Sequence, residues 1–446
     1  MSEIKVGVIS LGCAKNLVDT EVMLGILKEA GFKITGQPEK AEVLIINTCG
    51  FINDAKEESI NTIIEMGQYK KRGNCKVLIG TGCLTQRYGK ELLKEMPELD
   101  GVVGTGDYPD IVEVINGALA GLKVIHMSDS KFLYDHTSPR VLSGPPHRAY
   151  VKIAEGCSHR CAFCVIPRLW GDYRSREPLS IIKEVEELAA KGVKEINLIA
   201  QDTTGYGKDL KDKAVNLPSL LRDLVKIKDI SWIRVLYGYP DGITGDLIRV
   251  MASEEKICKY LDLPLQHAHP YILKKMRRPF NKEKIKDMIS TLRAEISGII
   301  LRSSFIVGFP GEKEFHFKEL YNFLNEVKFD RVGVFIYSRE EDTPAAQFKG
   351  QIKEKLKVKR YQSLMTLQKR ISREKNEAYK GSILEVLVEG KLQNSYFGRF
   401  YGQAPEVDGL VYFKSIYPLN TGQFVKVKIN AAGYYDLRGE VMYELS

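Results

Sequence analysis

Short apolar runs alternate with longer amphipathic stretches along the first quarter of the chain. Each apolar run has the length of a β-strand, and each following stretch repeats its apolar residues at the spacing of an α-helix. The pairs of run and stretch are residues 5–13 and 19–30, 41–49 and 54–71, and 76–83 and 86–95. Strands that alternate with helices form parallel sheets. The pattern therefore predicts an α/β domain with a parallel sheet over residues 2–118.

The alternation resumes after a segment of different composition. Residues 119–147 contain Pro145 and Pro146 among scattered charged residues, and we interpret this segment as a linker. Beyond it, further apolar runs are separated by amphipathic stretches such as residues 180–190. The expected strands are residues 149–154, 194–200, 232–237, 260–263, 299–307 and 331–337. These strand-helix units would form a partial (β/α) barrel over residues 148–375.

The last part of the chain changes to a β pattern. Residues 352–380 are strongly basic and helical, and we interpret them as a solvated connecting helix rather than an RNA contact, because charge runs alone are weak indicators. Short strand-like runs with turn residues between them follow over residues 378–446. This arrangement is typical of a small β-barrel.

Composition narrows the class of protein. The chain has 446 residues, of which 44% are hydrophobic and 28% are charged, so it can build several ordinary globular cores. Its apolar runs are far shorter than the roughly 20 residues of a membrane span, and its start lacks a basic region followed by an apolar stretch. We therefore expect a cytoplasmic monomer without a membrane anchor. The net charge of +9 suits contact with RNA or a ribonucleoprotein, but it indicates only non-specific attraction.

Three cysteines in one short loop are the first candidate for chemistry. Cys157, Cys161 and Cys164 have the spacing Cys-x3-Cys-x2-Cys directly after an expected strand. An iron-sulfur cube has four irons, so three thiolates would leave one iron open for a substrate. A zinc site with His159 as the fourth ligand is the alternative. Eight cysteines in a long chain without an export signal favour metal or catalysis over disulfides.

A second set of cysteines follows the strands of the first domain. Cys13, Cys49 and Cys83 each stand at the end of an expected parallel strand. The carboxyl ends of such strands lie on one edge of the sheet, so we expect these three residues to converge there. Each one alone would be interpreted as a small buried hydrophobic residue. Cys75 and Cys258 match no motif, and we interpret both as structural.

The cysteine loop resembles a known superfamily. An aromatic residue, Phe163, stands directly before the last cysteine, and an apolar strand precedes the loop. In these features the loop resembles the radical S-adenosylmethionine (SAM) superfamily. The resemblance implies that Cys157, Cys161 and Cys164 bind a four-iron four-sulfur (4Fe-4S) cluster, while the amino and carboxylate groups of SAM bind the open iron. One electron would then split SAM into methionine and a 5′-deoxyadenosyl radical that abstracts hydrogen from carbon.

The same resemblance implies further contacts with the cofactor. Phe163 matches a residue near the adenine of SAM, and the Gln201 region matches one beside its methionine part. Val307 and Gly308 match the strand end that passes the adenine. Glycine at position 308 would let the backbone approach the cofactor closely.

The motifs around the strand-end cysteines resemble the amino-terminal domain of the methylthiotransferases, which are radical SAM enzymes with two clusters. These motifs are Gly12-Cys13-Ala-Lys15-Asn16, Asn47-Thr-Cys49-Gly50 and Gly82-Cys83-Leu84. The resemblance implies a second 4Fe-4S cluster on Cys13, Cys49 and Cys83, and a catalytic role for all six cysteines. The carboxyl-terminal barrel resembles the TRAM domain of these enzymes. One departure is that residues 167–171 read Pro-Arg-Leu-Trp-Gly, where the family commonly has Pro-Ser-x-Arg or Lys-Gly.

Two branches of this family differ in substrate. One modifies an adenosine of tRNA, and the other modifies the β-carbon of an aspartate in ribosomal protein S-twelve of the small subunit. Segments 47–60, 156–161 and 398–409 resemble the second branch. The barrel has as many basic as acidic residues, so it is poorly suited to bind the phosphates of RNA. Its acidic stretch at residues 406–408 instead suits a basic ribosomal protein.

The resemblance implies methylthiolation of ribosomal protein S-twelve, free or in the ribosome, with an electron donor such as flavodoxin or ferredoxin. The alternative is a tRNA adenosine methylthiotransferase. A non-catalytic, metal-stabilised RNA-binding protein is a less favoured alternative from another class. Iron with matching sulfide would support the enzyme, and stoichiometric zinc would support the binding protein.

Overall fold

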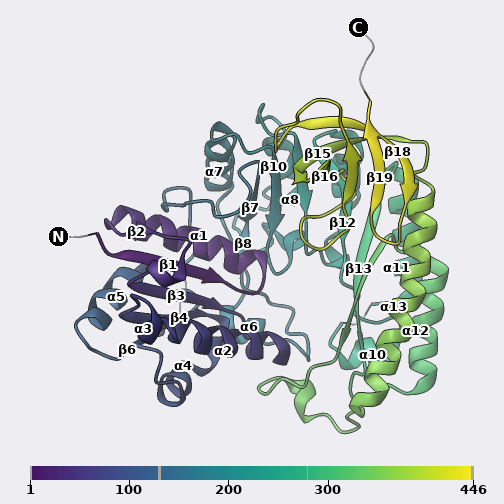
Figure 1. Ribbon diagram of the computed structural model, residues 1–446. Helices are drawn as coiled ribbons and strands as arrows, with labels where there is room; N and C mark the ends of the chain where they lie inside the picture. Colours follow the sequence, from purple (N-terminus) through teal and green to yellow (C-terminus); the bar gives the residue numbers. More distant parts are fainter. Residues whose placement is uncertain (1–2, 129–131, 279, 443–446) are drawn as a thin grey trace.

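A parallel sheet with helices on both faces forms the amino-terminal domain of the computed structural model (Figure 1), which describes residues 3–128, 132–278 and 280–442. Its strands are β1 (Lys5–Ser10), β2 (Lys33–Ile34), β3 (Val43–Thr48), β4 (Val77–Gly82), β5 (Gly101–Val103) and β6 (Val124–His126). Its helices are α1 (Ala14–Glu29), α2 (Asn53–Gly67), α3 (Tyr69–Arg72), α4 (Cys83–Glu95) and α5 (Ile111–Leu119). One core lies between the sheet and α1 and α5, and another between the sheet and α2 and α4. The prediction of a parallel-sheet domain is confirmed.

The strand order β2-β1-β3-β4-β5-β6 puts a topological switch between β1 and β3. Open α/β sheets bind ligands beyond the carboxyl ends of the strands at such a switch. The central strand β3 is buried along its whole length, as its near-continuous apolar sequence predicts.

Three local predictions in this domain need correction. Helix α1 starts at Ala14 rather than at residue 19, and the Asn16 side chain in its first turn donates to the backbone carbonyls of Leu11 and Thr48. Residues 54–71 form two helices rather than one. Strand β6 lies inside residues 119–147, where we expected only a linker. With only three residues at the edge of the sheet, it is too short to show a pattern.

The second domain is an open, six-stranded parallel sheet in the order β14-β13-β12-β11-β10-β7. Its strands are β7 (Arg148–Lys152), β10 (Glu195–Ile199), β11 (Trp232–Val235), β12 (Ile257–Asp262), β13 (Ile300–Val307) and β14 (Arg331–Ile336). The helices beside them are α7 (Pro178–Ala190), α8 (Leu217–Leu224), α9 (Gly245–Ser253), α11 (Lys282–Glu295) and α12 (Glu314–Val327). Short elements between them are β8 (Ala154–Glu155), α6 (Ile166–Trp170), β9 (Arg174–Ser175) and α10 (Pro270–Lys275). The predicted partial (β/α) barrel is confirmed.

Alternate residues of the core strands point to opposite faces. One face is apolar and packs on the helices, with residues such as Val151 and Leu198 fully buried. The other face carries buried polar residues at the intervening positions, among them Lys152, Asn197 and Arg234. An inner face of this kind cannot be held by apolar packing alone, because buried charges need partners.

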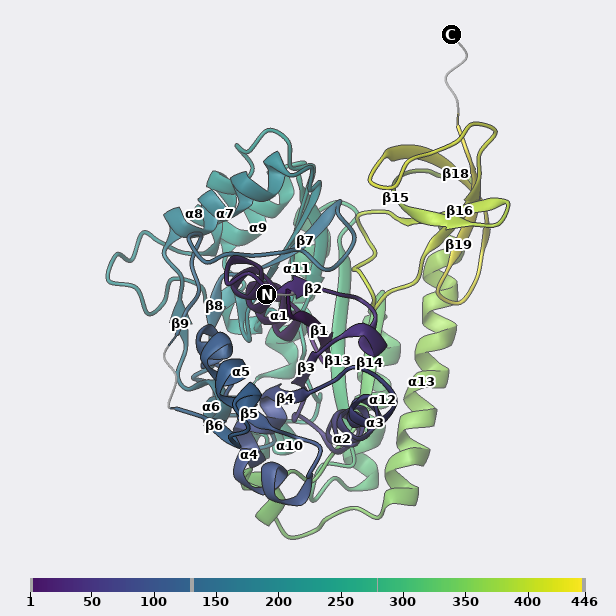
Figure 2. The same ribbon diagram turned by 60° about the vertical axis from the view of Figure 1, so that its left-hand side comes forward.

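Helix α13 (Glu354–Glu377) leads from the core to the carboxyl-terminal barrel (Figure 2). We expected this basic segment to be solvated, but one face of the helix is buried on the core. Lys357 donates to the Tyr337 carbonyl at 2.9 Å, and Arg360 forms an ion pair of 2.7 Å with Glu312. The basic residues of this face therefore stabilise the core, while others on the helix face solvent.

The carboxyl-terminal domain is a closed barrel in the order β15-β16-β17-β19-β18, as predicted. Its strands are β15 (Ile383–Leu392), β16 (Ser395–Arg399), β17 (Val411–Lys414), β18 (Phe424–Ala432) and β19 (Leu437–Val441). It docks on the amino-terminal parts of the core strands, where Arg399 binds both Glu195, the first residue of β10, and Glu389. Burial alone would raise the pKa of Glu389, but the hydrogen bond with His147 at 3.3 Å and the charge of Arg399 lower this pKa to about 2.

Glu406 and Asp408, the acidic residues that we expected to meet the substrate, already contact the core, although the Glu406 side chain is still 55% exposed. Asp408 accepts a hydrogen bond of 2.7 Å from the Tyr260 hydroxyl of the core. Glu406 pairs with Arg148 at 3.1 Å and accepts from the Tyr150 hydroxyl at 3.2 Å. Both carboxylates therefore fix the barrel to the core.

The helices of the described part of the chain include none that is long and apolar enough to cross a membrane.

Candidate active site

The loop with Cys157, Cys161 and Cys164 follows β7 and β8 at the carboxyl ends of the core strands and leads into α6. Burial raises the pKa of Cys157 to about 11 and that of Cys164 to about 12, and the neighbouring thiols add to both increases. The structure therefore brings these three cysteines together in a half-buried group. Thiolates so close to one another need a positively charged group such as iron.

His159 does not point to the cysteines as a fourth ligand would. Its Nε2 lies 2.7 Å from Asp202 Oδ2, and its ring stacks on Tyr239 with 3.7 Å between centroids. Although burial opposes it, hydrogen bonds from His159 and Thr204 hold the pKa of Asp202 below its usual range. His159 is therefore not placed to be the fourth ligand of a zinc ion at this loop, as the zinc alternative requires. In the described part of the chain, no group of three or more His, Cys, Asp and Glu side chains has the geometry to hold a metal ion directly.

Arg278 approaches the cysteine loop from a distant part of the sequence and was not among the predicted residues. Its Nη1 lies 3.6 Å from Cys161 Sγ, and its Nη2 donates to the Pro264 carbonyl at 2.7 Å. The guanidinium also lies 4.4 Å from the Tyr239 ring centroid. Because 117 residues separate Arg278 from Cys161, no local pattern in the sequence could have indicated this contact.

Gln201 follows β10 at the same edge of the sheet as the cysteine loop. Both polar atoms of its side-chain amide are buried, and neither has a hydrogen-bond partner in the described protein. Buried amides almost always have partners, so this one fits a position that a polar ligand completes. Phe163 lies half-buried beside Ala162 and Phe309.

Val307 is the last residue of β13, and Gly308 follows it directly. Gly308 has φ of +76°, and its amide donates to the Glu312 carboxylate at 3.0 Å. A Cβ at this position would lie only 2.3 Å from Cγ of Lys357. The packing of α13 therefore explains why glycine is needed, whereas we expected close approach of a cofactor as the reason.

Cys13, Cys49 and Cys83 follow the neighbouring strands β1, β3 and β4 and lie at one edge of the amino-terminal sheet. Burial raises the pKa of Cys83 strongly, and the nearby Cys13 and Cys49 thiols raise it further. Gly12 lets the chain turn here, because it has φ of +86° and a Cβ would lie 2.8 Å from the Cys49 Cβ. The structure thus brings this group together.

Asn16 supports the edge of this cysteine group. Its amide donates to the carbonyls of Leu11 and Thr48 at 3.1 and 3.0 Å, and its Oδ1 faces Cys83 Sγ at 3.9 Å. The two remaining cysteines lie elsewhere and have structural surroundings. The Cys75 thiol donates to the Val77 carbonyl at 3.3 Å, and Cys258 is buried within β12.

The two cysteine groups lie on either side of one domain interface. Trp170, from α6 after the first group, packs in a buried cluster with Cys83 of the second group. Thr105 also donates to the Leu169 carbonyl at 3.3 Å across the interface. Arg168, the displaced basic residue of this segment, pairs at 2.6 Å with Asp342 rather than pointing to either group.

Comparison with family models divides the chain into three parts. Residues 5–104 match an uncharacterized protein family, UPF0004, residues 151–324 match the radical SAM superfamily, and residues 381–442 match the TRAM domain. The three matches correspond to the amino-terminal sheet, the open core sheet and the barrel.

Curated proteins similar to the whole chain carry one name. Ribosomal protein uS12 methylthiotransferase RimO of Desulforamulus reducens is 54% identical over 440 residues, which cover 98% of this chain and 99% of that protein. The protein of the same name from Clostridioides difficile is 50% identical over 444 residues, which cover 99% of this chain and 100% of that protein.

Solved structures show the same arrangement of the chain at low identity. The radical SAM methyltransferase TsrM from Kitasatospora setae, with cobalamin and a [4Fe-4S] cluster bound, gives a TM-score of 0.57 at 14% identity and covers 86% of this chain and 81% of that one. The cobalamin-dependent radical SAM enzyme OxsB, with aqua-cobalamin and SAM bound, gives a TM-score of 0.52 at 13% identity. The match covers 82% of this chain and 56% of that one. At these identities the likeness concerns the fold alone.

Proposed function

The chain belongs to the RimO family of ribosomal protein uS12 methylthiotransferases, and we propose that it adds a methylthio group to the β-carbon of an aspartate of uS12 by radical SAM chemistry. The similarity to named relatives over the full chain carries this conclusion. The two separate groups of three cysteines support it, because methylthiolation by this route needs one site for radical formation and another for sulfur.

Each cysteine group suits a 4Fe-4S cluster with one iron left for another ligand. Cys157, Cys161 and Cys164 would hold the radical SAM cluster, and Cys13, Cys49 and Cys83 would hold the second. The chemistry that these groups and SAM supply when bound is one-electron cleavage of SAM and delivery of a methylthio group. The aspartate β-carbon has no acidic proton for a general base, so a radical route suits it.

The chain's own residues bind and orient the reactants. The unpartnered Gln201 amide offers a donor and an acceptor to SAM, and Phe163, Val307 and Gly308 provide the remaining contacts in this proposal. The hydrogen bond between His159 and Asp202 fixes the middle of the cysteine loop. Trp170 fills the space beside Cys83 and excludes water there.

The tRNA alternative has no specific support in the structure. The barrel is neutral overall, and its residues Glu389 and Arg399 are used to bind the core. For the electron donor we propose an acidic electron-transfer protein of the flavodoxin or ferredoxin class, because the net charge of +9 favours association with one. The monomeric state and the cytoplasmic location stay predictions.

The deciding experiment offers the reconstituted protein two substrates in parallel. It is incubated anaerobically with SAM, reductant and either a uS12 peptide or tRNA, and the products are analysed by mass spectrometry. We expect a methylthio mass gain on the peptide alone. A gain on tRNA alone would refute the substrate proposal while leaving the chemistry intact.

Cysteine variants test the assignment of the two groups. Alanine at Cys157, Cys161 and Cys164 should abolish cleavage of SAM. A triple alanine variant at Cys13, Cys49 and Cys83 should still cleave SAM but make no methylthio product. Full product from that variant would refute the two-cluster assignment. Cys75→Ala is the matched control, because this thiol lies in neither group, and it should keep full activity.

A further inference from the structure

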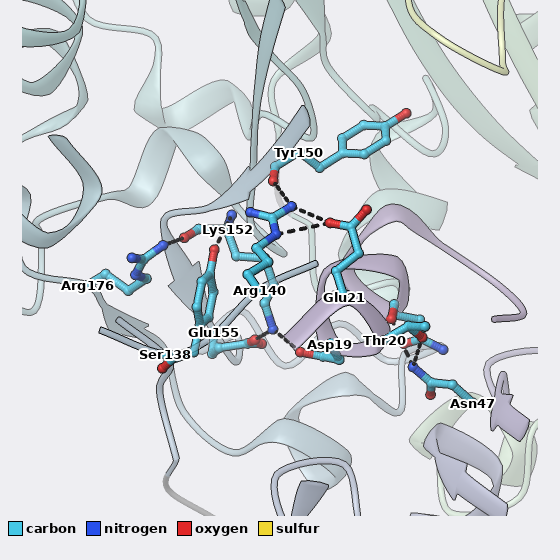
Figure 3. Close-up of polar contacts among 12 residues, drawn as sticks. Asp19, Thr20, Glu21, Asn47, Ser138, Arg140, Tyr150, Lys152, Glu155 and Arg176 are labelled. Atoms are coloured by element: carbon cyan, nitrogen blue, oxygen red, sulfur yellow. Dashed lines mark hydrogen bonds and ion pairs between the residues drawn. The ribbon is translucent and has the colours of Figure 1, made fainter. Parts of the chain in front are cut away.

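Lys152 is the last residue of β7 and lies on the inner face of the core sheet. Its side chain is 1% exposed, and its ammonium contacts the carboxylates of both Asp19 and Glu155 (Figure 3). A buried lysine is rare unless it is paired. Burial raises the pKa of Asp19 to about 7, and Lys152 is the strongest influence that lowers it. The ammonium is thus needed to keep the two buried carboxylates beside each other.

The two carboxylates come from the two domains that carry the cysteine groups. Asp19 is on α1, the helix that begins directly after Cys13. Glu155 ends β8, two residues before Cys157. A single ammonium therefore joins the segment behind one cysteine group to the segment in front of the other.

The Lys152 ammonium also lies near Trp170, the residue after the first cysteine group that packs against the second group. It is 5.5 Å from the Trp170 ring centroid, and Trp170 packs with Cys83. Movement of Lys152 would therefore affect contacts of both cysteine groups.

A second set of buried ion pairs holds the same domains together without using the Lys152 ammonium, although Arg176 also donates to the Lys152 carbonyl at 2.7 Å. Arg140 binds Glu21 of α1 at 2.6 Å and Glu184 of α7 at 2.5 Å (Figure 3 shows the bond to Glu21). Arg176 binds Glu184 from the other side at 2.6 Å. Loss of Lys152 should consequently leave the domains docked and change only the local alignment.

We propose that Lys152 is a positioning residue that sets the alignment of the two cysteine groups by bridging Asp19 and Glu155 across the domain interface. This inference rests on the proposed function, in which both groups act on the same carbon of the substrate. A displacement of about 1 Å between reacting groups can lower a rate by about 100-fold. Misalignment should therefore suppress methylthio transfer far more than cleavage of SAM, which needs only one group.

The test compares the full-length holoenzyme with Lys152→Met, which keeps the length of the side chain and removes its charge. Lys152→Arg is the conservative variant, and Arg140→Met is the matched control because it breaks the other buried tie at the same interface. Each protein is assayed for iron, for 5′-deoxyadenosine, for methylthio peptide, and for the dipolar coupling between the two reduced clusters by pulsed EPR.

We expect Lys152→Met to keep about eight irons and to form 5′-deoxyadenosine within about twofold of the parent. Its yield of methylthio peptide per 5′-deoxyadenosine should fall by at least about tenfold, and its distribution of intercluster distances should broaden. Lys152→Arg should restore much of both. Arg140→Met should change neither, although it lowers stability.

An unchanged product ratio and distance distribution in Lys152→Met would overturn the proposal. Loss of iron from one group would do so as well, because it would assign Lys152 to cluster binding. If Lys152→Met does not fold, Asp19→Asn removes one charge of the bridge with little change in shape, and the same two outcomes apply. If the parent itself makes no methylthio peptide, the proposed function fails, and the EPR comparison still decides the role of Lys152.

Discussion

Arg278 offers a quantitative test of the site, because its charge lies beside the cysteine group that we assign to the radical SAM cluster. Its guanidinium is 3.6 Å from Cys161 Sγ, and its side chain is buried. Reduction adds a negative charge to a cluster, so a fixed positive charge favours the reduced form and raises the potential. Arg278→Met should therefore lower the midpoint potential of this cluster.

The magnitude follows from the distance. Two unit charges at 3.6 Å interact with about 4.6 kcal/mol at an effective dielectric constant of about 20, which corresponds to about 200 mV for one electron. The added electron is spread over the cluster and lies farther from Arg278 than the cysteine sulfur does. We therefore take that figure as an upper limit and expect a decrease of about 50–100 mV.

The assay is a redox titration followed by EPR. A background with alanine at Cys13, Cys49 and Cys83 leaves one cluster to be titrated. Arg278→Lys should keep most of the potential, because it keeps the charge. Arg277→Met is the matched control, since this neighbouring side chain is exposed and solvent screens its charge. A potential for Arg278→Met within about 20 mV of the parent, with iron retained, would refute the electrostatic reasoning.

Three further predictions concern stability and Cys75, one of the two cysteines outside the two groups. Because the pKa of Glu389 is about 2 in the folded protein and 4.5 in the unfolded chain, its contribution of about 3 kcal/mol is present above pH 4.5 and is lost as the pH falls towards 2. The fluorescence of Trp232, which contacts the barrel, should report this loss, and Glu389→Gln should make the protein less stable at pH 7 and weaken the acid transition. Gly308→Ala should destabilise the protein by at least about 1 kcal/mol in thermal unfolding, because its φ is positive and Lys357 occupies the space; an unchanged midpoint would contradict this. Cys75→Ala should bind as much iron as the parent, and a loss of iron would make this thiol a ligand.

Periodic patterns in the sequence were sufficient to predict the three-part architecture. The short apolar run of β3 predicts a buried strand, and the strand-helix alternation implies parallel pairing. Parallel pairing in turn predicts that cysteines after successive strands share an edge, which the structure shows for Cys13, Cys49 and Cys83.

The contacts that complete the site had no such signal. Arg278 reaches Cys161 across 117 residues, and Lys152 reaches Asp19 across 133. A single charged residue in an apolar strand does not indicate its partner, because the partner is determined by how the domains dock. The short helix that carries Trp170 also escaped prediction, since five residues with a proline at the start show no helical period.

Buried charge at the domain interface also explains how two independent sheets acquire a defined mutual position. Apolar surfaces can slide over each other at little cost, because the hydrophobic effect has no direction. A buried ammonium between two carboxylates cannot slide, since each lost contact leaves an unpaired charge that costs several kcal/mol. Lys152 contacts the segments that lead to the cysteine groups, so such an error at this position would displace them, whereas the Arg140 ion pairs hold the same helix α1 through Glu21. Burying the charges of Asp19, Lys152 and Glu155 costs free energy. We explain this cost by the need to align two reactive sites within one chain.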